Sequence, residues 1–309
     1  MTEKEAEFIF TKSEDEIYSY VKQYEGFKYL SLIKKDDDEF ILELSLNTIL
    51  IDQKTSKKIK RDIRQIITEL TIEKTDKPLN IFNNDSTESF SFHDCKLNFL
   101  KQFRQKKSVQ AGQEVSKIKS GTLGAILKLN SNGQYYLLSN YHVIMGDTGV
   151  FHEPLFDKNR NKIGEIFWGK FDQTHDVAIG LITNGEPKSG TSNYDFGQLK
   201  KAVFSEKCKT FTKKGPKNNG IIYSTKAIVN IDSNFFKDQI LIKNLFLNYG
   251  DSGSVIVSEH KNDIIGICMG GDQELDIANK LDTLFKPKIN SFTDKQGRKM
   301  PEILYKSFH

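Results

Sequence analysis

The spacing of apolar residues changes along the chain. From about residue 108 onward, short apolar runs such as YYLLSNYHVI, VAIGLI and QILIKNLFL are separated by clusters of Gly, Asn, Asp and Lys. Many short strands with little helix are typical of an all-β barrel or sandwich. The second part of the chain, residues 108–309, is therefore predicted to be a mainly β domain.

The first hundred residues combine helical and strand periodicity. Ser13 and Glu16 have capping-box spacing, and apolar residues follow at helical spacing as far as Gly26. The runs FKYLSLI and EFILELSL predict two strands, the second with one buried face. Isoleucines between Ile59 and Ile67 predict a second helix, whose opposite, basic face is interpreted as solvated. Residues 1–107 are therefore predicted to form a small α+β domain.

Composition and charge narrow the class of protein. The 309 residues are 37% apolar and 28% charged, and a chain of this length has room for two folded domains. A net charge of +4, from 45 basic and 41 acidic residues, is too balanced to predict a nucleic-acid partner. The basic run from Lys207 to Lys217 is interpreted as an exposed loop between strands.

The N-terminal stretch and the scattered cysteines favour a cytoplasmic protein. The N-terminus, MTEKEAEFIF, is charged from its third residue and lacks the apolar stretch of a secretory signal. No apolar run approaches the roughly 18 residues that span a bilayer, so no membrane segment is predicted. The 3 cysteines are scattered and predict neither a disulfide framework nor a zinc site. Metal and nucleotide motifs are missing, so we expect no cofactor and no metal. The sequence leaves a homo-oligomer open.

The stretch NYGDSGSVIV places Ser252 between Asp251 and Gly253, directly before a β-branched run. A serine hydroxyl is a weak nucleophile that needs a base, a group to orient the base and donors for the developing oxyanion. Gly250 can adopt angles that aim its N–H with that of Ser252 at one point. Gly253 is expected to clear space for substrate, and Asp251 to turn inward. A glycine-containing turn before a strand is the alternative interpretation.

Two partners for this serine lie upstream. His142 follows an apolar run that breaks at Ser139-Asn140, and Asp176 opens the strand VAIGLI. An acid at the mouth of a strand can hold an imidazole and stabilise its cation. Each residue alone would be interpreted as structural, but the order His, Asp, Ser predicts a nucleophilic site. His175 points to the opposite face of that strand and is interpreted as a rim histidine, not a metal ligand.

These motifs together resemble a known family. Residues 115–285, with SNYHV, HDVAI and GDSGS, resemble a trypsin-like (chymotrypsin-fold) serine protease. The resemblance implies two packed six-stranded β-barrels, at roughly 115–187 and 195–275, with the site between them. It implies a serine endopeptidase that acts on a protein or peptide substrate. The implied catalytic residues are His142, Asp176 and Ser252, with the N–H groups of Gly250 and Ser252 as the oxyanion hole.

A narrower resemblance is to plant narrow-leaf-type proteases and their bacterial relatives. It rests on SGTLGAILK, LLSNYHV, GDSGSVIV and IANKLDTLF, and implies a short helix near the C-terminus. The separations of 34 and 76 residues within the triad resemble compact intracellular, HtrA-like or viral forms. Residues 1–105 lie outside both resemblances. We expect the domain at residues 1–107 to bind a regulatory partner or control access, by analogy with bacterial relatives in regulated, defence-related proteolysis.

The chain departs from digestive members of the family around the substrate pocket. Those members place an acid six residues before the serine, where this chain has a phenylalanine. An apolar P1 preference is therefore predicted for a pocket made of Phe246, Leu247, Tyr249, Met269, Gly270 and Gly271. Secreted members pair the aspartate before the serine with a new amino terminus. Asp251 is expected to have an internal partner instead, which the sequence does not name.

Two other functions compete with the protease interpretation. An α/β-hydrolase needs Gly-x-Ser-x-Gly, but Ser254 stands in place of the last glycine. That class also needs its acid and histidine after the serine, where only His260 and His309 remain as histidines. The other rival, which the sequence leaves open, is a catalytically silent protease fold that serves as a protein-binding module.

Overall fold

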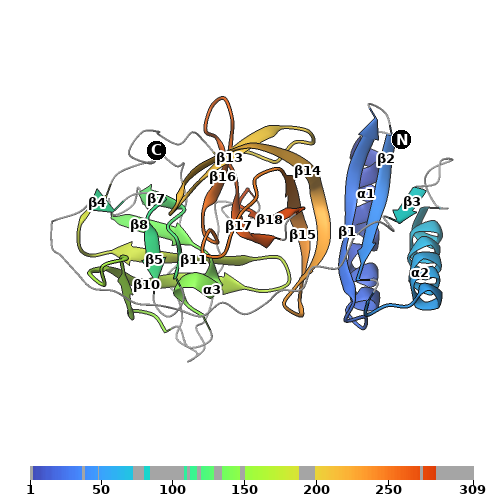
Figure 1. Ribbon diagram of the computed structural model, residues 1–309, viewed down its shortest axis with the longest axis horizontal. Helices are drawn as coiled ribbons and strands as arrows, with labels where there is room; N and C mark the ends of the chain where they lie inside the picture. Colours follow the sequence, from blue (N-terminus) through green and yellow to red (C-terminus); the bar gives the residue numbers. More distant parts are fainter. Residues whose placement is uncertain are drawn as a thin grey trace. The chain divides into compact units, whose positions relative to one another are not determined.

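The computed structural model describes residues 3–36, 39–47, 49–71, 80–83, 108–109, 112–116, 120–128, 134–146, 150–187, 199–271 and 274–282 (Figure 1). The chain divides into two compact units. The first contains Met1–Asn98 with Tyr223–Leu241, and the second contains Phe99–Ile222 with Ile242–His309. The sequence did not predict that Tyr223–Leu241 would join the N-terminal unit. The predicted boundary between residues 107 and 108 stays a prediction.

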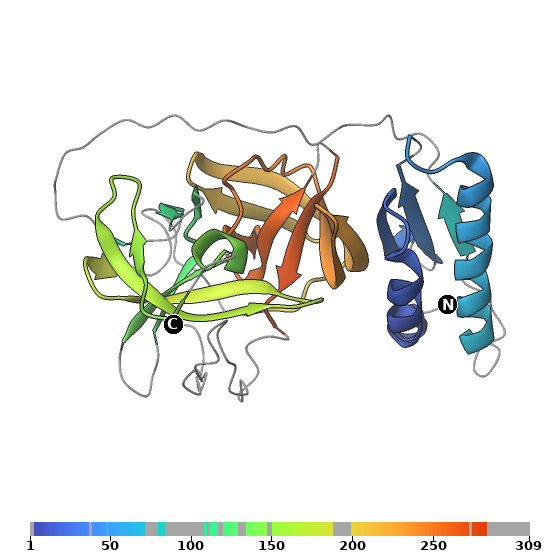
Figure 2. The same cartoon turned by 90° about the horizontal axis from the view of Figure 1, so that it is seen from below.

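The N-terminal unit combines two helices with a small sheet. Its elements are α1 (Glu3–Val21), β1 (Phe27–Asp36), β2 (Glu39–Leu46), α2 (Gln53–Thr71) and β3 (Asn80–Asn83). The strands β1 and β2 are antiparallel, and β3 pairs in parallel with β2. On its other side, β1 pairs with β14 (Gly215–Ile231), from Tyr29↔Val229 to Leu32↔Lys226. Figure 2 shows both helices alongside β1, β2 and β3.

The alternation seen in the sequence explains the core of this unit. Leu30 and Leu32 of β1 are fully buried, as are Leu42 and Leu44 of β2. The predicted second helix is confirmed as α2: Ile59 and Ile63 are buried, and Lys57, Lys58 and Arg61 are exposed. The Oδ1 of Asp52 accepts the N–H of Thr55 at 2.6 Å, which caps the start of α2.

The predicted start of the first helix was wrong. The helix α1 begins at Glu3, and Ser13 lies inside it instead of capping it. The Ser13 hydroxyl donates to the carbonyls of Ile9 and Phe10 at 3.0 and 3.1 Å, so it is satisfied within the helix. The apolar stripe extends upstream through Phe10, Ile9 and Ala6, which are buried, and this burial outweighs the capping signal.

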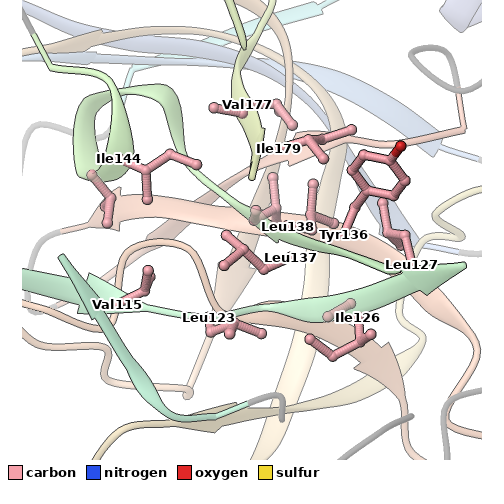
Figure 3. Packing of buried hydrophobic residues seen from close by; sticks show 14 of the residues in the cluster. Val115, Leu123, Ile126, Leu127, Tyr136, Leu137, Leu138, Ile144, Val177 and Ile179 are labelled. Atoms are coloured by element: carbon pink, nitrogen blue, oxygen red, sulfur yellow. The ribbon is translucent and has the colours of Figure 1, made fainter. Parts of the chain in front are cut away.

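The first β-barrel lies in the second unit. Its strands are β5 (Glu114–Ser116), β6 (Ser120–Thr122), β7 (Ala125–Lys128), β8 (Tyr135–Ser139), β9 (Pro154–Phe156), β10 (Lys162–Phe171) and β11 (Asp176–Ile182). The sheet order is β6-β5-β9-β10-β11-β8-β7. Only Leu123 and Gly124 separate β6 from β7, so the two ends of the sheet are one bent strand and the barrel closes with six strands. Figure 3 shows its buried core around Leu123, Leu137 and Ile179.

The second β-barrel closes by direct pairing. It contains β13 (Lys207–Thr212), β14, β15 (Asn234–Lys243), β16 (Val255–Ser258), β17 (Ile264–Gly271) and β18 (Asp276–Lys280). The order is β13-β16-β17-β18-β15-β14, and β13 also pairs with β14. The predicted fold class is thus confirmed: the chain is mainly β, with the double six-stranded barrel of trypsin-like proteases and a small N-terminal part. A separate pair of short strands, β4 (Ser108–Val109) and β12 (Glu186–Pro187), is parallel.

Two local predictions in the second barrel need correction. The run Lys207–Lys217 is not a loop, because it forms β13 and the start of β14, with Cys208 and Thr210 buried and Lys207 exposed. Within IANKLDTLF, the IANK part belongs to β18, where Ala278 pairs with Cys268 of β17. A helix was predicted there, and residues from 283 onward lie outside the described part of the chain. Among the described residues, no helix is long and apolar enough to cross a bilayer.

Candidate functional site

His142 is held at the rim of the first barrel. The strand β8 ends at Ser139, and after Asn140 the short helix α3 (Tyr141–Ile144) carries the histidine. Val143 and Ile144 are buried in the barrel core and anchor this turn. The imidazole, with 35% of its side chain exposed, stands at the edge of that core.

Asp176, at the start of β11, fixes His142 from two directions. Its side chain is almost fully buried, its Oδ1 accepts the His142 backbone N–H at 3.0 Å, and its Oδ2 pairs with the His142 Nδ1. A proton on Nδ1 facing this carboxylate leaves Nε2 as the acceptor nitrogen of the ring. The structure therefore brings two of the three predicted residues together in the orientation that a general base requires.

The backbone of Asp176 is held as firmly as its side chain. Its N–H donates to the Oδ1 of Asn279 at 2.7 Å, and its carbonyl accepts from the Nδ2 of Asn140 at 2.6 Å. Asn279 is fully buried on β18, so it ties β11 of the first barrel to the second barrel. The sequence did not predict this role of Asn279. The residue stood out there only as part of IANKLDTLF, one of the segments on which the narrower resemblance rests.

Ser252 lies on the loop that precedes β16. Its backbone carbonyl accepts the N–H of Thr122 at 2.8 Å. Its hydroxyl donates to the carbonyl of Met269 at 3.0 Å, and within the described residues it has no hydrogen bond to His142. The serine is thus half-buried beside β17, with its oxygen bound to a strand of its own barrel.

Gly253 explains how this loop meets the first barrel. A Cβ added at Gly253 would lie 2.2 Å from the Thr122 carbonyl oxygen and 2.3 Å from the Ser139 Oγ, and the residue has φ +94°. Gly253 therefore makes room for Thr122 of β6 and for Ser139 of β8, which leads to His142. Its expected role in clearing space for substrate stays a prediction. Only glycine allows both this close approach and this backbone angle.

Two backbone N–H groups are available next to the serine. Gly250 has φ +88°, and its carbonyl accepts the Thr122 hydroxyl at 3.0 Å, which fixes the peptide that follows it. Within the described part of the chain, the N–H groups of Gly250 and Ser252 have no hydrogen-bond acceptor. Free donors of this kind are what an oxyanion-binding site requires.

Asp251 is fully buried between these residues. Its Oδ2 accepts the N–H of Asn248 at 2.9 Å and pairs with the ammonium of Lys217 at 3.1 Å. The internal partner that the sequence could not name is therefore Lys217, on β14.

The six predicted pocket residues do not share one environment. Phe246 and Tyr249 are 61% and 69% exposed, whereas the Met269 side chain is buried with its sulfur facing the Asn279 amide. Leu247 is partly buried, and its N–H donates to Asp276 at 3.0 Å.

The two glycines of the set also differ. A Cβ at Gly270 would meet open space, while one at Gly271 would lie 2.6 Å from the Leu275 carbonyl. The pocket and its apolar P1 preference stay predictions.

The loop before Asp176 corrects the interpretation of His175. This histidine is buried, and its Nδ1 lies 3.2 Å from the Oδ1 of Asp172. Asp172 Oδ1 also accepts the N–H groups of Thr174 and His175, each at 2.8 Å. Burial raises the pKa of Asp172, but hydrogen bonds from His175 and Thr174 outweigh it and hold that pKa well below its usual range. The histidine is thus drawn inward as part of a folded loop.

The two described cysteines of the second unit, Cys208 and Cys268, are free and buried. Burial raises the pKa of the Cys208 thiol, and the same cause raises that of Cys268, where nearby Asp276 and Asp251 add to the effect. Both thiols therefore stay neutral and are unsuited to act as nucleophiles. Cys95 lies outside the described residues. No group of metal-ligating side chains occurs in the described ranges.

Several solved structures of proteases are similar to this chain. The chain is similar to the Nocardiopsis protease, with 14% identity over 58% of this chain and 95% of that chain and a TM-score of 0.48. It is similar to Thermobifida fusca protease A, with 14% identity, the same two coverages and a TM-score of 0.47. A glutamic acid-specific serine protease shares 16% identity over 57% of this chain and 96% of its own, with a TM-score of 0.47. No protein-family model and no curated protein matches the chain.

Proposed function

We propose that the protein is a serine endopeptidase that works through an acyl-enzyme. The observation that carries the proposal is the double contact of buried Asp176 with His142, on a barrel against which the loop of Ser252 is docked. Ser252 attacks the peptide carbonyl, and the Nε2 of His142 accepts its proton and later gives it to the leaving amine. Asp176 keeps the ring oriented and stabilises its positive charge.

The N–H groups of Gly250 and Ser252 hold the oxyanion in this proposal. Losing one such donor typically raises the barrier by roughly 3–4 kcal/mol. The reaction also requires the Ser252 hydroxyl to leave the Met269 carbonyl and turn toward His142. Hydrogen bonds of catalytic groups often tighten only when substrate is bound, so this rotation is part of the proposed cycle.

One observation favours the rival function. Because the Ser252 hydroxyl is bound to Met269, the same fold could serve as a catalytically silent protein-binding module. The two proposals differ in whether Ser252 can react at all.

A fluorophosphonate probe separates them. We expect the native protein to be labelled at one serine, with labelling lost in Ser252→Ala and strongly reduced in His142→Ala. Ser254→Ala, two residues along the chain, is the matched control and should label like the native protein unless its packing fails. Folded native protein that resists the probe would favour the binding module.

The remaining expectations concern substrate and setting. Profiling with a peptide library tests the apolar P1 preference, which dominant cleavage after Lys or Arg would contradict. A cytoplasmic location, a defence-related role, the relation to plant narrow-leaf-type proteases and a homo-oligomer stay hypotheses.

We assign the N-terminal unit a regulatory or partner-binding role. This is supported by β14, which contributes Gly215–Ile222 to the second unit while its continuation pairs with β1 in the first. Leu32→Pro removes a backbone N–H from β1 and should weaken that pairing. If labelling of Ser252 is unchanged in a folded Leu32→Pro protein, the regulatory role is contradicted.

A further inference from the structure

The carboxylate of Asp251 is a buried charge with few partners. It is fully buried, and its Oδ1 has no hydrogen-bond partner among the described residues. Its Oδ2 receives one backbone N–H and the Lys217 ammonium. A buried charge is tolerated only where it is paired and hydrogen-bonded, so this carboxylate depends on Lys217.

The ammonium of Lys217 holds the loop at two points. Besides Asp251, it donates to the carbonyl of Phe246, five residues earlier. The segment between these points contains Gly250, one of the two available amide donors. Lys217 itself is fixed because its backbone lies in β14, in register with Thr210 of β13.

The held segment adopts a costly backbone conformation. Phe246 has φ +53° and Gly250 has φ +88°, and the N–H of Asp251 turns back to the Asn248 carbonyl at 2.9 Å. A left-handed angle at a residue with a side chain costs of order 1–3 kcal/mol and persists only where its surroundings enforce it. The ammonium at Phe246 and Asp251 is such an enforcing contact.

We propose that Lys217 is a positioning residue that keeps the loop of Ser252 and the amide of Gly250 ready for reaction without any cleavage of the chain. The catalytic part of this inference rests on the proposed function. The ammonium neutralises the aspartate before the serine and holds it inside the protein.

The test compares Lys217→Met with Lys214→Met in the full-length protein. Lys214 is exposed in the same β13–β14 hairpin and serves as the matched control. The first readout is the rate of fluorophosphonate labelling at Ser252. The second is hydrogen exchange, by mass spectrometry, of a peptide covering residues 245–254 and of one covering β17.

We expect Lys217→Met to slow labelling about a hundredfold, comparable to the loss of one oxyanion donor. Exchange in residues 245–254 should rise while exchange in β17 stays unchanged, and Lys214→Met should change neither. Lys217→Arg, which restores the positive charge, should label Ser252 at no less than about a tenth of the native rate. Native labelling and native exchange in Lys217→Met would overturn the proposal.

A double variant separates positioning from simple charge burial. Lys217→Met with Asp251→Asn leaves no lone buried charge, so it should recover the thermal midpoint if the single variant unfolds. We expect it to label at least tenfold more slowly than the native protein. A double variant that labels at the native rate would show that Lys217 only neutralises Asp251.

The exchange readout also separates the two proposals. Native protein that resists the probe, while Lys217→Met still loosens residues 245–254, would refute the endopeptidase and leave the positioning role standing.

Discussion

Gly253→Ala tests the close contact between the loop before β16 and the first barrel. The added methyl group would lie 2.2 Å from the backbone oxygen of Thr122, well inside the 3.0 Å that real Cβ atoms respect, and backbone cannot turn aside as a flexible side chain can. It would also lie 2.3 Å from the Ser139 Oγ, which donates to that same Thr122 oxygen at 2.9 Å. The methyl group therefore collides with the Thr122 carbonyl of β6 and with the Ser139 hydroxyl that donates a hydrogen bond to it.

The expected cost has two parts. Forcing alanine to φ +94° costs about 1–2 kcal/mol. Overpacking a close contact costs roughly 1–3 kcal/mol more. Together about 2–5 kcal/mol would be lost from a total stability typically of 5–15 kcal/mol. The folded fraction that survives should also label slowly at Ser252, because the loop must move away from the strand that leads to His142.

Urea unfolding followed by fluorescence measures this loss. Gly270→Ala is the matched control, because a Cβ there meets no atom within 4 Å, and its stability should stay within about 0.5 kcal/mol of the native value. Finding Gly253→Ala as stable as Gly270→Ala would refute the close contact between the barrels.

Two further perturbations test the hydrogen bond that holds the Asp176 backbone and the loop that precedes this residue. Asn279→Ala leaves the buried N–H of Asp176 without its acceptor, so we expect a loss of about 1–3 kcal/mol in urea unfolding and slower labelling of Ser252. Asp172→Asn removes a carboxylate whose pKa is lowered by folding, largely through His175 and Thr174 against the opposing effect of burial. A lowered pKa gives stability that is present above the unfolded value near 3.8 and is lost as pH falls toward the folded value. The native protein should therefore lose more thermal stability than Asp172→Asn between about pH 5 and pH 3, by a small amount because this side chain is 41% exposed. Parallel melting curves for the two proteins over that range would contradict the role of Asp172.

The residues that could be predicted carry their signal locally. His142 follows an apolar run that ends in two polar residues, and Asp176 begins another such run, so each position could be identified within about ten residues of sequence. The barrels were predictable for the same reason, since strand alternation is a property of neighbouring residues.

Lys217 could not be found in this way. It is one of 45 basic residues, and its partner Asp251 lies 34 positions later on a different element. Only the pairing of β13 with β14 fixes where its side chain begins. The place of Tyr223–Leu241 in the N-terminal unit could not be predicted either. The sequence pattern of β14 does not show that its first half pairs with β13 while its second half pairs with β1.

The polar residues that interrupt the apolar runs are those that hold the candidate site together. Ser139 ends β8, and its hydroxyl donates to the Thr122 carbonyl. The N–H of the same Thr122 donates to the Ser252 carbonyl. Asn140 follows and donates to the carbonyl of Asp176. An apolar pair at these two positions would complete the strand pattern, but it would remove one hydrogen-bonded link to the loop of Ser252 and one to Asp176. Local departures from a folding pattern are expected where function requires them. Ser139-Asn140 is therefore best understood as the joint through which the strand before His142 is tied to both of its proposed partners.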